Sequence, residues 1–535
     1  GGVPCPVKMR VTVVVCLALL GCALASVASM NMNPDGTMTL SETFDTDAVA
    51  VSRFSDDLET TGWTHIWVQT NAANLDADQA YAAGYVEGWL TEERMTQHWV
   101  NYMHVFLGNF PAGYIDPRVY TFIQEQYDWA IEQIHNNPED TFWQQVNLQL
   151  QQTEGFTDGY NAHASEEDQK TLLDILLYQA EGDCYDIIPA VMSEKRIDSF
   201  TDPEGAYHKQ HFETHCTAMV KPIPGDVVAG HTTWTHYGEM DRIYKHYRFN
   251  YSVSKAVEYS FSSKFGYMFS KDDFWVTSMG LVIMETTNSV HDQSLYDNVT
   301  PKSLLTWQRC AIASRMAGSA QQWVETFAKH FSGTYSNQWM ALSPMQGMVD
   351  SSFWVYEETP GFNHWEDMSA TVRDKGYWPS YNIPYFKYMQ DVTGYTEMCE
   401  LHGSDYCYDE CPRATIFQRD ALHVTSLEDI KDFLRYNDWQ NDPLSLDNPA
   451  NQISARYDLR TQNPSSYGGI DSKATSGRMA SHQEAWAQSG PSHDDETVFC
   501  WSDGDVNGNA WTEEHVGQPD CWDMDWEYMS WNGFH

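Results

Sequence analysis

Cys216 begins a short apolar run and is the residue best suited to nucleophilic chemistry. The run continues past Val220, turns at Pro224-Gly225-Asp226 and returns through a second apolar run to His231. This pattern predicts a β-hairpin with the thiol at the start of its first strand. Hydrolysis of the peptide bond in front of Cys216 would give this one residue both a thiol nucleophile and an α-amino base.

A structural role for the same thiol is the competing interpretation. A cysteine in a strand is more often a small buried hydrophobic residue than a catalyst. The hairpin alone therefore favours a buried structural cysteine, and a catalytic assignment depends on the rest of the sequence.

The composition indicates a large folded protein that binds neither nucleic acid nor anionic membrane surfaces. The chain has 535 residues, of which 42% are hydrophobic and 14% aromatic, so it can bury the core of two domains or of one large compound domain. Its formal net charge of −44 would repel nucleic acid and anionic membrane surfaces. We therefore expect no nucleic-acid partner.

The first residues are typical of a secretory signal. A basic stretch at residues 8–10 precedes an apolar run at 11–24, and small residues offer cleavage after Ala25 or Ser29. The run is short for a membrane span of about 20 residues, and we find no transmembrane segment later in the chain. We expect residues 1–29 to be removed, and a protein that is secreted or held in a lysosome-like compartment.

An oxidising compartment permits disulfides. The nearest cysteines suggest the pairs Cys407 with Cys411 and Cys500 with Cys521, and we expect Cys310 to stay reduced and buried. No CxxC pair and no convincing zinc site occur, so we expect no metal and no cofactor.

Two tripeptides are acceptor sites for N-linked glycans. They begin at Asn250 and Asn298, and a proline excludes the third candidate at Asn463. Behind a signal peptide we expect both of the remaining sites to be glycosylated.

The elements that must position the hairpin differ before and after Cys216. Helical periodicity from Asp76 to about Gln152 predicts a mainly helical N-terminal part, with a break at Gly155 and Gly159. Helices followed by many strands fit helix layers over sheets better than a barrel. Further predicted helices cover residues 172–181, 304–331 and 427–434, and predicted strands cover 251–254, 274–277 and 280–287.

Ten short segments of the chain, taken together and in their order, form a specific pattern. They are AYAAGYVEGWLT at 80–91, NPEDTFW at 137–143, DGYN at 158–161, the hairpin with GHTTW at 230–234, RIYKHY at 242–247, METT at 284–287, SYNIPYF at 380–386, PRATIF at 412–417, SAR at 454–456 and YGGIDSK at 467–473. Together they resemble the phospholipase B-like family of N-terminal-nucleophile hydrolases. The resemblance covers about residues 76 to 499 and leaves the acidic, Trp-rich tail outside.

The resemblance implies a fold and a maturation step. The fold class would be α+β, with four layers in the order αββα and a helical N-terminal part. The precursor would cut itself between His215 and Cys216 and leave two associated chains, of residues 30–215 and 216–535. The tail from about residue 497 would be an appendage clipped by a disulfide, and two copies of the protein could form a homodimer.

The resemblance also implies roles for individual residues. Without the family, His231 would be interpreted as a strand histidine and Asn382 as a turn residue. We also expect a cation, such as an arginine, near the thiol, because an acidic lumen otherwise keeps the thiol and the amine protonated. The implied catalytic residues are Cys216, His231 and Asn382, and the implied substrate-binding or positioning residues are Trp234, Thr286 and Thr287.

Three functions remain open at this point. The resemblance implies an ester hydrolase that removes acyl chains from glycerophospholipids. The second candidate is an amidase that acts on N-acyl amines or small peptides, because fold does not settle substrate. The third is a lumenal binding glycoprotein that keeps the fold without turnover. A long apolar cleft beside Cys216 would favour the lipid, and a short polar one the amide.

Overall fold

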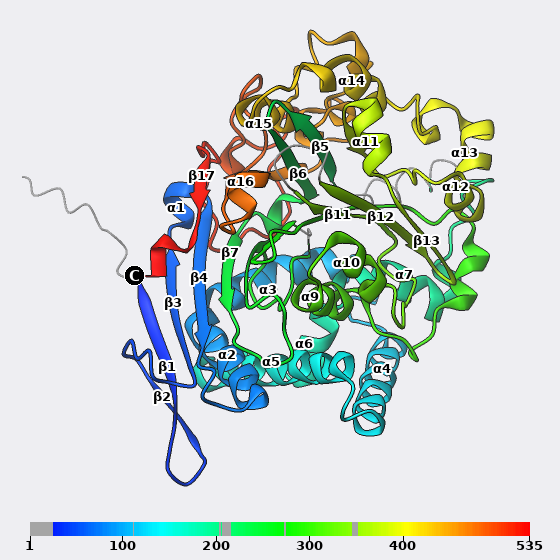
Figure 1. Cartoon of the computed structure of the whole chain (residues 1–535). Helices are drawn as coiled ribbons and strands as arrows, with labels where there is room; N and C mark the ends of the chain where they lie inside the picture. Colours follow the sequence, from blue (N-terminus) through cyan, green and yellow to red (C-terminus); the bar gives the residue numbers. More distant parts are fainter. Residues whose placement is uncertain are drawn as a thin grey trace, which may run out of the picture.

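Helices and two large β-sheets make up the computed structural model, which describes residues 25–110, 112–202, 205, 216–271, 274–344 and 351–534. The helices labelled α14 and α15 lie at one end of the molecule and α2 and α5 at the other, with strands between them (Figure 1). His215 and most of the predicted signal lie outside the described residues. No helix within the described ranges is long and apolar enough to cross a membrane.

The two sheets have 11 and six strands. In order across the larger sheet, the strands are β13 (Phe362–Asp367), β12 (Ser352–Thr359), β11 (Asn337–Ser343), β10 (Val282–Thr287), β9 (Phe274–Thr277), β8 (Glu258–Ser263), β7 (Arg242–Arg248), β4 (Trp63–Thr70), β3 (Ala50–Asp56), β1 (Ser26–Met32) and β2 (Met38–Ser41). The smaller sheet contains β14 (Trp378–Ser380), β5 (Thr217–Ile223), β6 (Asp226–His236), β15 (Tyr467–Ser476), β16 (Ala485–Ser489) and β17 (Glu527–Met529).

The helices follow the helical periodicity from Asp76 onward and the later helical segments, whereas residues 26–70 form the strands β1 to β4 and one short helix. The helices are α1 (Leu58–Thr61), α2 (Asp76–Leu90), α3 (Glu92–Leu107), α4 (Pro117–Asn136), α5 (Thr141–His163), α6 (Leu172–Gln179), α7 (Glu181–Val191), α9 (Thr306–Met316), α10 (Ala320–Phe327), α11 (Ser369–Lys375), α12 (Lys387–Thr393), α13 (Tyr395–His402), α14 (Pro412–Asp420), α15 (Leu427–Arg435) and α16 (Gly477–Ala480).

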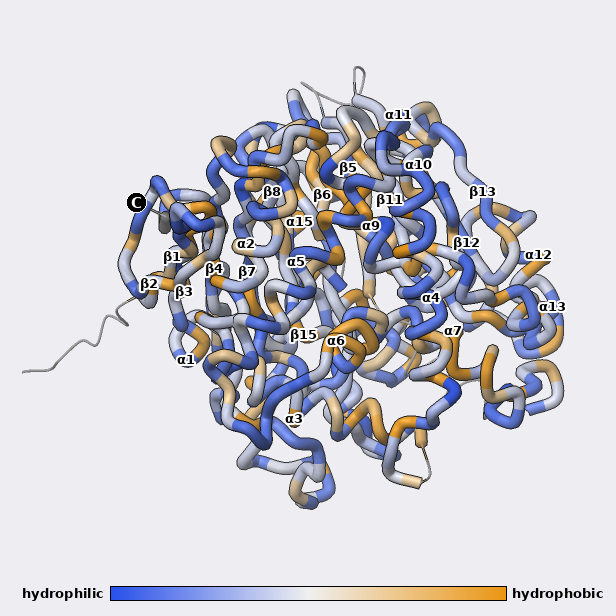
Figure 2. The backbone as a smooth tube through the Cα atoms, turned by 90° about the horizontal axis from the view of Figure 1, so that it is seen from below, coloured by the Kyte–Doolittle hydropathy of each residue, from blue (hydrophilic) through white to orange (hydrophobic). Residues whose placement is uncertain are grey.

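Three main core clusters hold the helices and sheets together. Ile283 and Met284 are successive residues of β10 and therefore face opposite sides of the larger sheet. Ile283 packs with Val86 of α2 and other helical residues, whereas Met284 packs with Val220 of the smaller sheet. A third cluster joins the smaller sheet to α14 and α15, with Leu434 at its centre. The hydrophobic segments of β5 and β6 lie inside the molecule (Figure 2).

The larger sheet crosses the predicted cleavage point in the sequence. Strand β4 precedes Cys216 and β7 follows it, and the two pair in parallel from Trp63 with Arg242 to Gln69 with Arg248. Backbone hydrogen bonds between these strands therefore join the two predicted chains within one sheet.

Two sequence-based predictions of local structure are wrong. Helix α5 runs without a break through Gly155 and Gly159, because these glycines allow α2 to approach closely: a Cβ there would lie 2.0 Å from the Tyr81 carbonyl oxygen and 2.1 Å from that of Tyr85. The predicted strand at 251–254 is a turn instead. Its Ser252 amide and hydroxyl donate to the carboxylate of Asp76 at the start of α2, which replaces strand pairing.

The disulfides confirm one predicted pair and correct the other. Cys500 bonds Cys521 as expected, but Cys407 bonds Cys399 rather than Cys411. The end of α13 and the following turn bring Cys399 within 4.9 Å of Cys407, Cα to Cα, while Cys411 is buried in the core beneath α14. Cys310 is reduced and buried, as predicted.

The Trp-rich tail is part of the fold rather than an appendage. It supplies β17 to the smaller sheet, where Met529 pairs with Ala485. Its Trp522 is fully buried and packs in one cluster with Tyr237 and Met240. The tail therefore completes a core that the hairpin strand β6 leads into.

The chain start and the two glycosylation sites have defined surroundings. Strand β1 begins at Ser26, so cleavage after Ala25 would leave it whole. Asn298 is exposed at the end of a 3₁₀ helix. Asn250 is only part-exposed, and its side-chain amide donates to the Thr70 carbonyl oxygen at 2.5 Å. Of the two predicted sites, Asn298 is the better presented for modification.

Candidate active site

The predicted hairpin is present, and Cys216 lies immediately in front of its first strand. Strand β5 begins at Thr217 and pairs with β6 so that Thr217 faces Thr232 and Ala218 faces His231. The backbone φ of Cys216 is 96°, a left-handed value that costs a non-glycine residue roughly 1–3 kcal/mol. The side chain is 1% exposed. The residue that carries the thiol is thus one of the strained positions of the backbone.

Three side chains converge at the thiol. The Sγ of Cys216, a ring nitrogen of His231 and a carboxylate oxygen of Glu285 all lie within 4.8 Å of one another. The thiol donates to Glu285 Oε1 at 4.0 Å. His231 Nε2 lies 2.9 Å from the backbone carbonyl oxygen of Glu285 and must donate to it, because a carbonyl oxygen only accepts. Strand β10 of the larger sheet therefore meets the hairpin of the smaller sheet at this point.

Burial has the largest effect on the pKa of the Cys216 thiol. It raises the pKa of Cys216 well above its usual value, and the Glu285 carboxylate raises it further. The backbone N–H of Trp234 and the ammonium groups of Lys473 and Lys271 act in the opposite direction. In the uncut chain the thiol is therefore protonated, and a nearby group must accept its proton before it can attack.

Arg413 of α14 is the cation that joins the predicted site residues. One guanidinium nitrogen donates to the Cys216 carbonyl oxygen at 2.8 Å, and the other donates to Asn382 Oδ1 at 2.6 Å. The guanidinium also lies 4.3 Å from the ring centre of Trp234. Burial lowers the pKa of Arg413. A single planar group thus fixes the backbone of Cys216 and the amide of Asn382.

Asn382 lies between the two sheets of the site. Its φ is 69°, also left-handed, and its side chain is 1% exposed. Nδ2 donates to the Thr287 carbonyl oxygen at 2.7 Å.

The remaining predicted residues differ in how close they lie to the groups that contact the Cys216 thiol. Thr287 donates to Glu285 Oε2 at 3.4 Å, so it helps to hold the carboxylate beside the thiol. Thr286 instead shares a 2.6 Å hydrogen bond with Ser380 of β14, which tethers the two sheets. Trp234 is 3% exposed and packs under Arg413. Thr287 is therefore closer to the thiol's contacts than Thr286.

Two charged residues of the site were not predicted from the sequence, the acidic Glu285 and the basic Lys473. Glu285 follows the apolar run Val282–Met284 in a strand that is buried throughout, and Lys473 lies in the equally buried strand β15, which also contains Asp471. Lys473 donates to Thr233 of β6, and to Asp471 at 2.5 Å. A charged residue in a fully buried strand is rarely tolerated unless it is paired. A charge in a strand predicted to be buried is therefore the signal that could have identified both residues.

A cavity of about 770 Å³ lies at α3, α7 and the end of β6, and none of Cys216, His231 and Glu285 lines it. Its wall includes Glu181 and Tyr185. Lys271 connects this wall with the site: its ammonium lies 3.7 Å from Glu181, 5.2 Å from the ring centre of Tyr185, and interacts electrostatically with Cys216. The apolar part of the wall contains Tyr102, Val105, Phe106, Ile188, Pro189 and Ile197.

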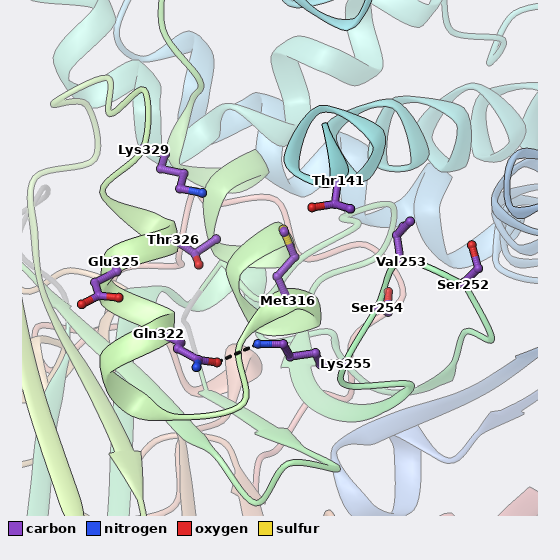
Figure 3. Close-up of a pocket in the computed structure, with 10 residues that line it drawn as sticks. All are labelled: Thr141, Ser252, Val253, Ser254, Lys255, Met316, Gln322, Glu325, Thr326 and Lys329. Atoms are coloured by element: carbon purple, nitrogen blue, oxygen red, sulfur yellow. Dashed lines mark hydrogen bonds between the residues drawn. The ribbon is translucent and has the colours of Figure 1, made fainter. Parts of the chain in front are cut away.

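A second pocket, of about 540 Å³, lies where α9 and α10 meet the loop before β8 (Figure 3). Across it, Lys255 donates to Gln322 at 2.8 Å. Its lining residues belong neither to the cluster at Cys216 nor to the residues that Lys271 contacts. We therefore assign it no part in the chemistry.

The cluster at the thiol also contains the residue types of a metal site. Cys216, His231 and Glu285 could each offer one ligand atom to a cation. In this structure the contact of His231 Nε2 with a backbone carbonyl oxygen orients the ring, and the thiol donates to the carboxylate of Glu285. The expectation of no metal stays a prediction.

Comparison with known proteins gives one consistent result. The model of the family described as "Phospholipase B" matches residues 50–529, so the tail predicted to lie outside the family is largely inside it. The chain is 35% identical to "Phospholipase B-like protein C" of Dictyostelium discoideum, over 95% of this chain and 91% of that protein. It is 34% identical to "Phospholipase B" of Crotalus adamanteus, over 93% and 91%. A solved variant of conjugated bile acid hydrolase from Clostridium perfringens matches at 10% identity over 59% of this chain and 97% of that one, with a TM-score of 0.30.

Proposed function

Because the chain belongs to the phospholipase B family, we propose that it is a hydrolase that removes acyl chains from glycerophospholipids, with Cys216 as its nucleophile. The observation that carries this proposal is the convergence at the thiol. Cys216, His231 and Glu285 meet within 4.8 Å, and Arg413 ties the same residue to Asn382. A buried structural cysteine would need none of these polar partners.

Maturation would create the catalytic base. Cleavage between His215 and Cys216 gives Cys216 a free α-amino group, which would accept the thiol proton during turnover. The thiolate would attack the ester carbonyl, and the acyl-enzyme thioester would then be hydrolysed by water. The paired strands β4 and β7 support the proposal that the two chains stay associated after cleavage.

The layer order of the fold is part of the same proposal. The three core clusters lie between helices and the larger sheet, between the two sheets, and between the smaller sheet and helices. This sequence of clusters supports the predicted order αββα. The nucleophile would then stand at the edge of the inner sheet pair, where His231 and Glu285 face each other across the gap.

Asn382 would donate to the oxyanion that forms on the substrate. We expect Asn382→Gly to lower kcat by roughly 10²-fold with little change in KM, because one lost oxyanion donor typically costs about 3–4 kcal/mol of barrier. Glycine accepts the left-handed backbone at this position, so strain is not added. Steady-state kinetics on the matured protein measure the effect.

Asn463→Gly is the matched control. Asn463 also has a positive φ, of 50°, but it is exposed in a loop. Its kcat should equal that of the wild type. An Asn382→Gly enzyme with unchanged kcat would exclude the amide as an oxyanion donor.

The cavity beside Lys271 favours a lipid over a small amide. Its volume of about 770 Å³ and its apolar wall can hold a long acyl chain. We expect Val105→Trp to lower kcat/KM for long-chain phosphatidylcholine by about 10-fold. Excluding two methylenes from an apolar wall costs about 1.6 kcal/mol. Hydrolysis of a short-chain analogue should not change.

Val100→Trp is the control for this variant. Val100 lies on the same helix, α3, but it is 43% exposed and does not line the cavity. It should leave both substrates unaffected. Equal losses for long and short chains in Val105→Trp would count against an acyl chain in this cavity.

The decisive test of the proposed function combines processing and substrate. N-terminal sequencing of purified protein should find a chain that begins Cys-Thr-Ala-Met-Val. The matured protein should then release fatty acid from phospholipids in a panel that also contains N-acyl amines. Release from the N-acyl amines alone would establish the amidase instead. A mature protein that is still one chain and hydrolyses nothing would support a binding glycoprotein.

A further inference from the structure

We propose that the carboxylate of Glu285 is the base that activates Cys216 for cleavage of the protein's own backbone. The inference rests on the proposed function, because it concerns the first step of the proposed maturation. At that stage the α-amino group of Cys216 is still part of a peptide bond and cannot accept a proton. Another group must therefore take the thiol proton in the precursor.

Glu285 is the acceptor that the structure places at the sulfur. The Cys216 thiol donates to Glu285 Oε1 at 4.0 Å, within the range of a hydrogen bond from sulfur. Both residues are buried, at 1% and 0% exposure, so bulk water does not compete for the proton. The β10 backbone holds the carboxylate in place through pairing of Glu285 with Trp339 of β11.

The other polar groups near the thiol are poorly suited to the same task. The Nε2 of His231 donates to the Glu285 carbonyl oxygen at 2.9 Å and therefore carries a hydrogen. The lone pair of the neutral ring is then on Nδ1, which lies 3.5 Å from the Thr233 hydroxyl oxygen. Arg413 is a permanent donor directed at the Cys216 carbonyl oxygen. Lys271 and Lys473 act on the thiol as positive charges. Among these groups, Glu285 is the acceptor to which the thiol is seen to donate.

Neighbouring donors favour the ionised form of this carboxylate. The hydroxyl of Thr287 donates to Oε2 at 3.4 Å. The hydroxyl of Tyr335 lies 3.2 Å from Oε1 and shares its one hydrogen with the Lys271 carbonyl oxygen, which is closer at 2.7 Å. The ammonium of Lys271 interacts electrostatically with Glu285. Hydrogen bonds and a nearby cation both stabilise a buried carboxylate in its charged state. These contacts oppose the effect of burial, which by itself favours the neutral acid.

The cleavage step balances with one water molecule. The Sγ proton moves to Glu285, and Sγ bonds to the carbonyl carbon of residue 215. The C–N bond to Cys216 breaks as the Glu285 proton passes to the departing nitrogen, which leaves a thioester and a free α-amino group. Water then hydrolyses the thioester, which restores the thiol and leaves a carboxylate at residue 215. Glu285 is unchanged at the end.

The test measures how fast the freshly made precursor becomes two chains. Wild type, Glu285→Gln and Glu285→Asp are expressed with their signal replaced, and conversion is followed by gel electrophoresis and mass spectrometry. We expect Glu285→Gln to be processed at least 100-fold more slowly, since a general base typically contributes 10²- to 10⁴-fold. Glu285→Asp should be at least about 10-fold slower, because its shorter side chain withdraws the carboxylate from the sulfur.

A second buried carboxylate provides the control. Glu87→Gln makes the same change on α2, where Glu87 pairs with Lys245 at 2.5 Å, and it should be processed at the wild-type rate. Circular dichroism and thermal melting identify any variant that fails to fold. If Glu285→Gln does not fold, the folded Glu285→Asp variant gives the result.

The outcomes separate this inference from the proposed function. A wild-type chain that is never cut contradicts the proposed function itself. A wild-type chain that is cut, together with folded Glu285→Gln or Glu285→Asp variants that are cut at the same rate, overturns the role of Glu285 and leaves the nucleophile in place.

Discussion

Cys216→Ala is expected to remain one uncut chain and to lose hydrolysis of every substrate. Removal of a nucleophile that acts together with its base typically lowers turnover by roughly 10⁴- to 10⁶-fold. The substitution has two separate effects. It removes the sulfur that would cut the chain, and it thereby prevents formation of the base that cutting would create. Gel electrophoresis reports the first effect, and fatty-acid release reports the second.

Cys310→Ala provides the matched control for this variant. Cys310 is another reduced, fully buried cysteine, but it lies on α9 in the core between helices and the larger sheet. Its removal should cost some stability and leave both processing and hydrolysis intact. A Cys216→Ala protein that still matures to two chains would show that another protease makes the cut.

Arg413→Ala is expected to lower kcat by about 10²- to 10⁴-fold, depending on whether one or both partners are displaced, while the protein remains folded. The guanidinium anchors the carbonyl oxygen of Cys216 and the side chain of Asn382 at the same time. A misplaced nucleophile costs about 10²-fold, and a misplaced oxyanion donor costs a similar factor. Arg413→Lys should recover only part of this loss, because one ammonium cannot replace a planar fork that binds both partners.

Arg419→Ala is the control for this variant. It removes an arginine from the same helix, α14, at a position away from the thiol. Arg419 is part-exposed and pairs with Asp420 and Asp442 at 2.7 Å. Its removal should shift the melting temperature slightly and leave kcat unchanged. If Arg413→Ala raises KM with kcat intact, the guanidinium binds substrate and does not position the nucleophile.

The strained backbone connects these two predictions. Cys216 and Asn382, the predicted nucleophile and oxyanion donor, both have positive φ, at 96° and 69°. Such conformations persist only where surrounding contacts enforce them. Arg413 supplies a contact to each residue, so its removal should relax both backbones together.

Local pattern was sufficient for much of the fold. The alternation around a Pro-Gly turn predicted the hairpin at Cys216, and regular spacing of apolar residues predicted the helices from Asp76 onward. Both signals arise within a few residues along the chain, where hydrogen bonding and side-chain direction are set by the backbone period. Where packing between helices decided the outcome, as at Gly155 and Gly159, the local pattern misled.

The hairpin placed His231 and Trp234 near Cys216 from sequence alone, because one tight turn fixes their register. The partners that give the thiol its environment come from distant segments: Glu285 from the facing sheet and Arg413 from a helix on the outer side. No sequence spacing links these residues to Cys216. Their meeting depends on how two sheets and a helix pack, which is a property of the whole core. The sequence therefore determined the candidate nucleophile, and the tertiary structure determined its acceptor, its cation and its burial.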